Sequence, residues 1–457
     1  MAFQHSCFLM AEPAFALNEL PRTASLSEAA ARRIGRRALR AAFLGFFVDM
    51  FDVYLPVIAL GPAMSYFQPA TLSPAVQSTL FYIVFALSLV GRPIGAAIFG
   101  HYSDRIGRRK VTMISMAGFA IVTLLIALLP GYQTWGFAGI VALVLLRFID
   151  GFFLGGEYTS ANPLAMEYAP KERRGQWAAF IHSAFPISMI VMALITAAML
   201  RIAPAGSPSS PYAVWGWRIP FFAGTLAAFG VFFYYLRSVP ESRVWARSEK
   251  VHSPLRELFH RDNLRILSQV FLLMSGAWFT LNIVTSILPG VLLTVRHVSS
   301  ITVTNAQLIE NSAMALWFVP FGMIGQRIGR RKVLWLLGVA GCSVGPFLYY
   351  LLVRFGYRNP FELIVLFTLI NFCATPVWAI VTSYINERFS TRVRATGYGV
   401  GYSAATIIPA FSSFYMLGLK GLGMPYAYTE VALFALGGLL LMLGALTGPE
   451  TRHVEIA

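Results

Sequence analysis

The stretch GHYSDRIGRRK, at Gly100–Lys110, separates two apolar segments that are each too long for the core of a soluble protein. It holds one acid, four Lys or Arg residues and two glycines. It therefore predicts a very short polar loop that holds two membrane-spanning helices at a fixed angle against the membrane surface. A second copy, GMIGQRIGRRK, follows at Gly322–Lys332. The two copies indicate that the chain is built twice around this loop.

The composition excludes a soluble protein. Hydrophobic residues make up 57% of the 457 residues, charged residues make up only 12%, and the mean hydropathy is +0.65, whereas globular chains carry about 25% charged residues. The net charge of +16 would also suit a nucleic-acid-binding protein. However, most of the 36 Lys and Arg residues fall in the two tails, the central linker and alternate loops. This asymmetry follows the positive-inside rule, so we expect both termini in the cytoplasm and no nucleic-acid partner.

The cysteines and the N-terminal residues add no further module. Cys7, Cys342 and Cys373 form no paired or metal-binding motif, so we expect neither a disulfide framework nor a metal site. The first 31 residues lack a basic segment that leads into an apolar core, so they do not resemble a signal peptide. We expect residues 1–40 to form a cytoplasmic tail, disordered at its start.

Hydropathy divides the rest of the chain into twelve spans. The first six are expected near Ala41–Phe67, Val76–Gly100, Val111–Pro130, Trp135–Ser160, Gly175–Leu200 and Trp217–Leu236. The second six are expected near 266–294, 305–325, 333–353, 361–385, 395–417 and 424–447. Residues 238–265 are the longest polar stretch and predict a cytoplasmic linker, and residues 448–457 predict a cytoplasmic tail. The predicted fold is an all-α polytopic membrane protein with two pseudo-symmetric six-helix bundles, 41–237 and 266–447.

Two further landmarks recur in the same order in both halves. Glu167 has a counterpart in Glu387, and Pro240-Glu241-Ser242 after the sixth span has a counterpart in Pro449-Glu450-Thr451 after the twelfth. Together with the two copies of the loop, they indicate a parallel duplication, in which the bundles are related by an axis along the membrane normal.

Over nearly the whole chain from about residue 41, these motifs resemble those of the major facilitator superfamily. Gly100-x-x-x-Asp104-Arg105-x-Gly107-Arg108-Arg109 is similar to the signature loop between its spans two and three. Five other motifs are similar to those of its metabolite:proton symporter group, which is related to the sugar porters. They are Gly45-x-x-x-Asp49-x-Phe51-Asp52, Arg92-Pro93-x-Gly95-Ala96, Arg147-x-x-x-Gly151-x-x-x-Gly155-Gly156-Glu157, Glu167-x-x-Pro170-x-x-x-Arg174-Gly175 and Trp215-Gly216-Trp217-Arg218-Ile219-Pro220-Phe221. The resemblance implies the major facilitator fold.

Several ionisable residues lie inside the predicted spans, where a charge at the bilayer centre costs at least about 2.5–3.5 kcal/mol. Asp49 and Arg92 fall at similar depth on spans one and two, so we expect them to form an ion pair. Arg147 and Asp150 lie three residues apart on span four, so we expect a second ion pair there. One interpretation is a proton-coupling site at a central cavity. The other is that the pairs only neutralise one another and orient the helices. The candidate residues are Asp49, Asp52, Arg92, Arg147, Asp150 and His182.

The resemblance also implies a gate on the cytoplasmic side. Asp104 would cap the N-terminus of span eleven, near Ala395–Gly397, in the outward-facing state, where a carboxylate is worth up to about 2 kcal/mol. Counting residues along span four places Glu157 near Asp104, so we assign it to the gate. Gln326 replaces the acid in the second copy, so the halves are expected to contribute unequally. The predicted gate residues are Gly100, Asp104, Arg105, Gly107, Arg108, Arg109, Glu157, Glu167, Arg174, Gln326, Arg327, Gly329, Arg330, Glu387 and Arg394.

The second half has few ionisable residues at depth. Glu310, Glu362 and Glu430 are all expected near the outer ends of their spans. We therefore expect a division of labour, in which the first half handles protons and the second half recognises the substrate. The candidate substrate residues are Asn282, Asn371, Thr375 and Trp378.

These features predict a secondary active transporter that works by alternating access in the cell inner (plasma) membrane. The resemblance implies proton-coupled symport of a small organic anion, such as a mono-, di- or tricarboxylate, or of a zwitterion. Proton-driven efflux of a toxic metabolite or drug, and a transporter-like membrane sensor of a metabolite, are the alternatives. No phosphate-binding loop or catalytic cluster appears in the loops, so we expect no enzyme activity. We expect protons, a small molecule and the lipid bilayer as partners, no cofactor, and a monomer.

Overall fold

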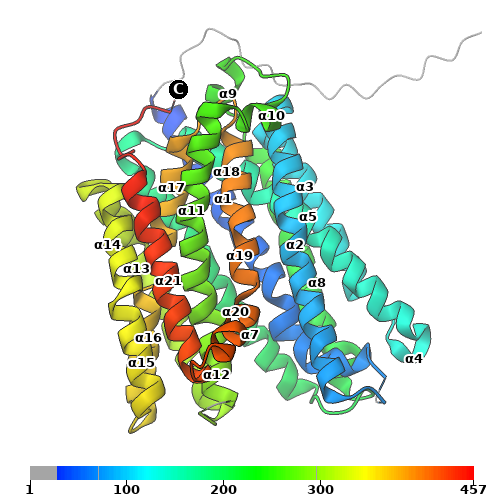
Figure 1. Ribbon diagram of the computed structural model, residues 1–457. Coiled ribbons are helices and arrows are strands. Elements are labelled where there is room, and N and C mark those ends of the chain that lie inside the picture. Colours follow the sequence, from blue (N-terminus) through cyan, green and yellow to red (C-terminus); the bar gives the residue numbers. More distant parts are fainter. Residues whose placement is uncertain (1–27, 70, 295, 457) are drawn as a thin grey trace, which may run out of the picture.

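A computed structural model describes residues 28–456, except residues 70 and 295. The described residues form helices and no strands, and the helices lie in two bundles side by side (Figure 1). Among these residues, 11 helical segments are long and apolar enough to cross a membrane. A further span consists of two shorter consecutive helices, α16 (Pro360–Phe372) and α17 (Trp378–Arg388). The predicted all-α architecture is confirmed, and each of the twelve predicted spans has a counterpart.

The first bundle holds spans one to six. Its first helix begins at Glu28 instead of near Ala41, so residues 28–40 of the predicted tail are helical; residues 1–27 lie outside the described part of the chain. The elements are α1 (Glu28–Leu55) with η1 (Pro56–Leu60) and η2 (Gly61–Tyr66), α2 (Pro74–Ile106), α3 (Arg108–Ala127), α4 (Tyr132–Trp135), α5 (Phe137–Tyr168), η3 (Lys171–Arg173), α6 (Arg174–His182), α7 (Ala184–Ile202), η4 (Tyr212–Gly216) and α8 (Arg218–Ser238).

The linker and the second bundle follow. Two short helices lie in the linker, α9 (Arg243–Arg247) and α10 (Pro254–Leu258). Besides α16 and α17, the second bundle consists of α11 (Arg261–Asn282), η5 (Ile283–Ile287), α12 (Leu288–Thr294), α13 (Ser300–Ile328), α14 (Arg330–Cys342), α15 (Val344–Phe355), α18 (Arg394–Ser403), η6 (Ala404–Thr406), α19 (Ile407–Ala410), α20 (Ser412–Gly421) and α21 (Tyr426–Thr447).

The two copies of the polar motif are mostly helical, and only a glycine in each turns the chain. Helix α2 ends at Ile106 and α3 begins at Arg108, so Gly107 alone separates them, with a φ of 117°. Gly329 separates α13 from α14 in the same way, with a φ of 110°. Residues with a Cβ atom disfavour such positive φ angles, whereas glycine adopts them readily. The polar residues of each motif therefore lie on the last turn of one helix and the first turn of the next.

A glutamate after the last span of each bundle caps the helix that follows this glycine. Glu241 accepts a hydrogen bond from the backbone N–H of Arg108 at 3.0 Å, and Glu450 accepts one from the N–H of Arg330 at 3.0 Å. The first N–H groups of a helix have no partner within the helix, and a carboxylate there also interacts favourably with the helix dipole. The caps correspond in the two halves, which agrees with the predicted duplication.

The linker helices α9 and α10 and the C-terminal end of the chain lie at one end of the molecule, which we call the linker side, opposite the far side (Figure 1). Toward the linker side, buried apolar residues of both bundles form one shared core, to which Leu164 and Ala445 belong. Toward the far side each bundle has a core of its own, around Trp217 in the first and Phe434 in the second. The bundles are therefore held together mainly at the linker side.

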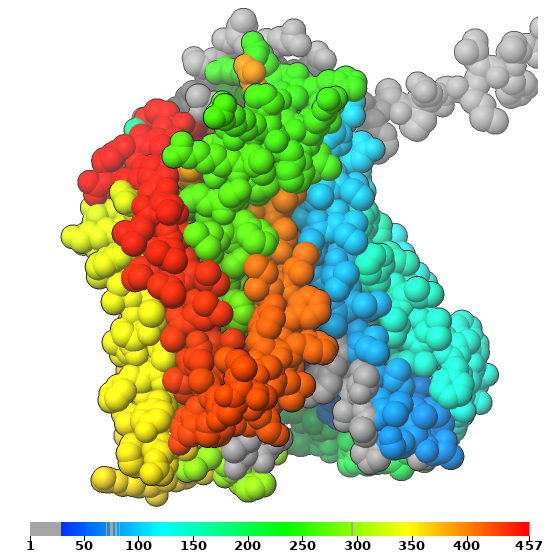
Figure 2. Space-filling view, viewed as in Figure 1, coloured from blue at the N-terminus to red at the C-terminus, as the bar shows by residue number. Residues whose placement is uncertain are grey.

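The linker reinforces this contact. Helix α10 packs against both α2 of the first bundle and α18 of the second, and Figure 2 shows the linker lying over the ends of these two helices. The indole N–H of Trp245 donates to the backbone carbonyl of Asp104 at 2.8 Å. The linker thus covers the end of the interface between the bundles.

Candidate functional site

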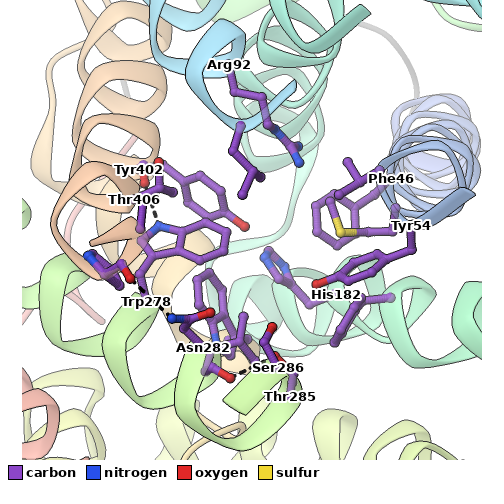
Figure 3. A pocket seen from close by; sticks show the side chains of 18 of the residues that line it. Phe46, Tyr54, Arg92, His182, Trp278, Asn282, Thr285, Ser286, Tyr402 and Thr406 are labelled. Carbon is purple, nitrogen blue, oxygen red and sulfur yellow. Dashed lines mark hydrogen bonds between the residues drawn. The ribbon is translucent and has the colours of Figure 1, made fainter. Parts of the chain in front are cut away.

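A cavity of about 100 Å³ lies between the two bundles, and both bundles contribute residues to its wall (Figure 3). Apart from tyrosines, the charged or titratable side chains among its described lining residues are those of Arg92 and His182, and Asn282 lines it from the second bundle. The other walls are mainly apolar, with the aromatic residues Phe46, Tyr54, Phe85, Phe185, Trp278, Phe318, Trp378 and Tyr402.

Two spans of the second bundle depart from α-helical geometry where they line the cavity. In span seven, the π-helical turn η5 follows Asn282 and contains Thr285 and Ser286. In span eleven, the 3₁₀ turn η6 ends with Thr406. Such irregular turns inside long helices are frequent at functional sites. Here they bring hydroxyl groups to an otherwise apolar wall.

Asp49 and Arg92 form the predicted ion pair at the edge of the cavity. The Arg92 Nη2 atom donates to both carboxylate oxygens of Asp49, at 3.0 and 2.7 Å. Both side chains are buried, but only Arg92 lines the cavity. Its guanidinium also lies over the ring of Tyr158, 5.1 Å from the ring centroid. Arg92 is therefore the positive charge that a molecule in the cavity would meet first.

A second buried group of charges lies away from the cavity wall. The Arg147 Nη1 atom lies 3.2 Å from Asp52 Oδ1 and 2.8 Å from Asp150 Oδ2, and the Thr123 hydroxyl donates to Asp52 Oδ2 at 2.6 Å. The predicted Arg147–Asp150 pair is thus present, with Asp52 as an additional partner. All three charged residues are buried, and none of them lines the cavity.

His182 reaches the cavity from α6, where it bridges the two bundles. Its Nδ1 atom lies 3.3 Å from the Ala178 carbonyl, and the Thr382 hydroxyl of the second bundle lies 3.4 Å from each ring nitrogen. The ring also packs against Phe46 and Trp378, at centroid distances of 4.7 and 6.4 Å.

Only two of the four candidate substrate residues, Asn282 and Trp378, line the cavity. Asn371 donates to the Phe367 carbonyl at 3.0 Å, and Thr375 donates to the Asn371 carbonyl at 3.0 Å. These two side chains satisfy backbone groups beside the break between α16 and α17. Their polarity therefore serves the broken helix and does not face the cavity.

The sequence analysis missed Trp278 and Tyr402, which form an aromatic wall with Trp378. The ring centroids of Trp278 and Trp378 are 4.5 Å apart, and the Trp278 indole N–H donates to the Tyr402 carbonyl at 2.8 Å. The neighbouring Phe279 is buried in the core of the second bundle instead. Adjacent residues of a helix point about 100° apart. The sequence therefore indicated that one of the two aromatic residues at 278–279 could face the cavity, but it did not show which one.

At the linker side, Asp104 of α2 binds the N-terminus of α18, as the resemblance implied. Its Oδ1 atom accepts from the Ala395 N–H at 3.2 Å, and its Oδ2 atom accepts from the N–H and the hydroxyl of Thr396 at 2.8 and 2.6 Å. Arg108 holds the same carboxylate at 2.7 Å. The helices approach so closely that a Cβ atom on Gly100 would lie 2.8 Å from the Thr396 Cα atom.

A second contact across the bundles extends this gate. The Glu167 carboxylate accepts from Arg394 at 2.7 Å and from Arg108 at 3.2 Å, and the Ser242 hydroxyl donates to it as well. Arg108 also donates to the Thr391 carbonyl of the second bundle at 3.0 Å. Arg108 and Glu167 thus each connect the two halves.

The second copy of the motif makes the corresponding contacts with an amide in place of the acid. Gln326 Oε1 accepts from the Gly175 N–H at 3.1 Å, at the start of α6. Arg330 binds Glu387 at 2.6 Å, and Arg174 of the first bundle lies 3.7 Å from Glu387. The Thr451 hydroxyl donates to Glu387 at 2.7 Å, as Ser242 does to Glu167.

Within the described part of the chain, three of the predicted gate residues have side chains that form neither a hydrogen bond nor an ion pair across the interface. The side chains of Arg105 and Arg327 are exposed. Arg109 donates to the Leu236 carbonyl of its own bundle at 2.8 Å. Their position in the motif suits a basic surface beside the membrane.

Glu157 was assigned to the gate, but the structure places it elsewhere. It is completely buried, and its carboxylate lies against Gly45 of α1, where a Cβ atom would meet Glu157 Oε1. The groups that bind Asp104 are Arg108, Ala395 and Thr396. The count along one helix fixed the depth of Glu157 but not the direction in which its side chain points.

Two of the three acids expected near the outer ends of their spans are buried. Glu310 and Glu430 are buried, with exposed fractions of 3% and 0%, whereas Glu362 binds the N–H of Arg358 near the start of α16. The second bundle therefore holds buried acids too. Neither of them lines the cavity.

The chain is similar to known membrane transporters. Residues 42–310 match the family model described as Major Facilitator Superfamily. The chain is 30% identical to the citrate-proton symporter of Salmonella typhi, over 80% of this chain and 82% of that one. It is 27% identical to the shikimate transporter of Escherichia coli, over 84% and 86% of the two chains, and 26% identical to the proline/betaine transporter of the same species, over 92% and 83%.

A solved structure shares the fold. The proton:xylose symporter XylE bound to 6-bromo-6-deoxy-D-glucose superposes with a TM-score of 0.74, over 92% of this chain and 97% of that chain, at 19% identity. The predicted two-bundle architecture with twelve helices is in agreement with this match.

Proposed function

Because the chain belongs to the Major Facilitator Superfamily and is a secondary transporter, we propose that it couples the movement of a small organic anion to the movement of protons. The proposal rests above all on Arg92, which lines the cavity while it holds the buried carboxylate of Asp49. A guanidinium binds a carboxylate with strong, charge-assisted hydrogen bonds. Asp49 and a substrate carboxylate would therefore compete for the same group.

This competition couples the two movements. A proton that binds Asp49 releases Arg92, which then binds the carboxylate of the substrate. When the anion leaves, Asp49 loses its proton and pairs with Arg92 again. A buried charge without a partner is strongly unfavourable. States that hold only the proton or only the anion are therefore disfavoured, and the two travel together.

The surrounding charges support proton binding. The buried cluster of the first bundle holds more acids than bases, namely Asp49, Asp52, Asp150 and Glu157 against Arg92 and Arg147. Full ionisation of this cluster would leave negative charge without compensation in a medium of low dielectric constant. The cluster thus has the capacity to take up protons during transport.

The cavity favours a substrate with one carboxylate on a cyclic or aromatic body. Arg92 and His182 are its only charged or titratable side chains other than tyrosines, among the described lining residues. A tricarboxylate would bring more negative charge than these groups can compensate, and buried charges need partners. The rings of Trp278, Trp378 and Tyr402 instead offer apolar surface to a flat body.

Transport by purified protein in lipid vesicles tests this function. A thermal-shift screen with ring-containing monocarboxylates, betaines and tricarboxylates identifies the substrate, and we expect the monocarboxylates to raise the melting temperature most. With that substrate, the Asp49→Asn variant should lose accumulation driven by a pH gradient but keep exchange at equal pH, because Arg92 no longer depends on a proton. Asp52→Asn tests the second acid in the same way.

The control is Asp262→Asn, which removes an exposed acid on the first turn of α11. It should accumulate substrate as the wild-type protein does. If Asp49→Asn still accumulates substrate against its gradient, the Asp49–Arg92 pair is structural and the coupling is wrong. The same vesicles show the direction of transport. We propose uptake across the inner membrane, with the linker side in the cytoplasm, as the basic loops predict.

A further inference from the structure

Glu157 is a buried acid that neither takes part in the gate nor lines the substrate cavity. It lies on α5 and is completely buried, and neither carboxylate oxygen has a hydrogen-bond partner within the described part of the chain. A buried polar group without a partner is costly, and a buried charge is more costly still. Such a group in a membrane protein calls for a functional explanation.

The Glu157 carboxylate occupies the space beside Gly45, which has no side chain. A Cβ atom on Gly45 would meet Glu157 Oε1 and would lie 2.8 Å from the Met116 side chain. Gly45 precedes Asp49 by four residues on α1, which is about 6 Å along the helix axis. Because α1 runs from the linker side toward the far side, Glu157 lies one helical turn closer to the linker side than Asp49, along the same face of α1.

The groups around Glu157 connect it to the Asp49–Arg92 pair. The charged and titratable residues within electrostatic range are Asp49 from α1, Arg92 from α2, Tyr235 from α8 and Tyr398 from α18. Helix α3 contributes the apolar Met116. Among the described residues, no Lys or Arg side chain forms an ion pair with Glu157. In the proposed transport cycle Asp49 gains and loses a proton, so Asp49 is the neighbouring group that can donate a proton to Glu157.

We propose that Glu157 is a second proton carrier, which takes the proton from Asp49 and passes it toward the cytoplasm. In this step the O–H bond of the Asp49 carboxyl group breaks and an O–H bond forms on a Glu157 oxygen. The Asp49 carboxylate then pairs with Arg92 again and displaces the substrate. The proton leaves Glu157 for water once the gate at Asp104 opens. The inference rests on the proposed proton coupling, and it gives the proton an exit separate from that of the anion.

Infrared difference spectroscopy tests this role with protons alone as the probe. The full-length protein is placed in vesicles of phosphatidylethanolamine and phosphatidylglycerol, and the carboxyl C=O bands are recorded as the pH is stepped. We expect Glu157→Gln to remove one band that changes with pH. We also expect Asp49→Asn to shift the pH at which this band changes, because the two carboxyl groups influence each other.

The matched control is Glu430→Gln. Glu430 is also completely buried without a hydrogen-bond partner in the described residues, but it lies on α21 of the second bundle, in range of Tyr349. Its band should be the same with and without Asp49→Asn. If the band removed by Glu157→Gln does not change with pH, or is unaffected by Asp49→Asn, Glu157 is a permanently protonated packing residue and the inference is wrong.

Transport separates this inference from the proposed function. In the same vesicles, Glu157→Gln should abolish pH-driven uptake of shikimate, a cyclic monocarboxylate, and retain shikimate exchange at equal pH. Glu157→Asp, which restores the acid, should recover part of the uptake. If Glu157→Gln accumulates shikimate as the wild-type protein does, the relay is wrong while the symport function stands. If the wild-type protein shows neither pH-driven uptake of any acid in the panel nor a pH-dependent carboxyl band, both are wrong.

Discussion

Gly107 shows how much one residue contributes to the arrangement of two spans. Its φ of 117° is a conformation that residues with a Cβ atom avoid, and a Cβ atom would also meet the Glu241 carboxylate that caps α3. We expect Gly107→Ala to destabilise the protein by about 1–3 kcal/mol, the usual cost of such backbone strain. The melting temperature of the purified protein, measured in one detergent, reports this change.

Gly230→Ala is the control for this substitution. Gly230 lies inside α8, and nothing lies within 4 Å of the position that its Cβ atom would take. Alanine is favoured over glycine inside a helix by about 1 kcal/mol, so this variant should melt at the wild-type temperature or above it. A Gly107→Ala variant as stable as the wild-type protein would show that the turn tolerates other residues and that the glycine has no conformational role.

The sequence predicted which charged residues pair better than it predicted the direction in which a side chain points. The pairs Asp49–Arg92 and Arg147–Asp150 were predictable because a charge inside a span needs a partner at the same depth. Glu157 and Trp278 were not, since depth along a helix says nothing about which neighbour a side chain faces. Asn371 and Thr375 looked like cavity residues, but their side chains bond to backbone carbonyls near the break between α16 and α17.

At the scale of helices, the gate consists of two caps of different strength. Asp104 caps α18 with a carboxylate, and Gln326 caps α6 with an amide. A negative charge at a partly buried helix N-terminus is worth up to about 2 kcal/mol, and a neutral amide lacks this term. The contact between α2 and α18 should therefore hold the linker side closed more strongly than its counterpart.

Exchanging these side chains should shift the gate in opposite directions. We expect Asp104→Asn to favour the state open at the linker side and Gln326→Glu to favour the closed state. Spin labels on the exposed residues Lys110 and Lys332, in a variant without the native cysteines, report the distance between the bundles by electron double resonance. If Asp104→Asn keeps the wild-type distance distribution and normal transport rates, Asp104 is not part of a gate.

Hydropathy located the helices well, because a span needs about 20 apolar residues whatever its neighbours are. It was less accurate for the ends of the helices and for the break within one span. Helix α1 begins at Glu28, before the predicted start near Ala41, and buried Ala38 on this extension packs into the shared core. Helix α2 extends to Ile106, because only Gly107 turns the chain. Span ten is broken between Phe372 and Trp378, where Pro376 has no backbone N–H to donate, and hydropathy does not detect this.

At the scale of the whole molecule, the state seen here is closed at the linker side. The bundles share one core there and have separate cores toward the far side. For the transporter to reach its other state, the shared core must separate, and the cavity then opens to the linker side. Contacts that cross the interface only at the linker side therefore set the balance between the two states.

One of these contacts is the C-terminal strap, which we define as Arg452–Ile456. It leaves the second bundle and binds the first, where the Arg174 side chain donates to the Val454 carbonyl at 2.6 Å and Lys171 pairs with Glu455. Near its own bundle, Arg452 donates to the Arg327 carbonyl at 2.6 Å. The strap thus connects the two bundles beside the gate. We expect its contacts with the first bundle to form only while the linker side is closed.

Ending the chain at Thr451 should favour the state open at the linker side. The Arg174 hydrogen bond to the Val454 carbonyl contributes about 1–2 kcal/mol, so we expect a several-fold increase in the open population. The label pair on Lys110 and Lys332 measures it. Glu455→Gln, which removes only the ion pair, should have a smaller effect. An unchanged distance distribution in the shortened chain would show that the strap does not influence the gate.

The pH dependence of this effect has a definite sign. The hydrogen bond and the charge of Lys171 hold the pKa of the Glu455 carboxyl below its usual value of 4.5. An acid whose pKa is lowered in the folded state contributes its contact above the usual value and loses it as the pH falls through the lowered one. The difference between the full chain and the Glu455→Gln variant should therefore be the same at pH 6 and pH 8. A difference that shrinks within this range would assign the strap's effect to another titrating group.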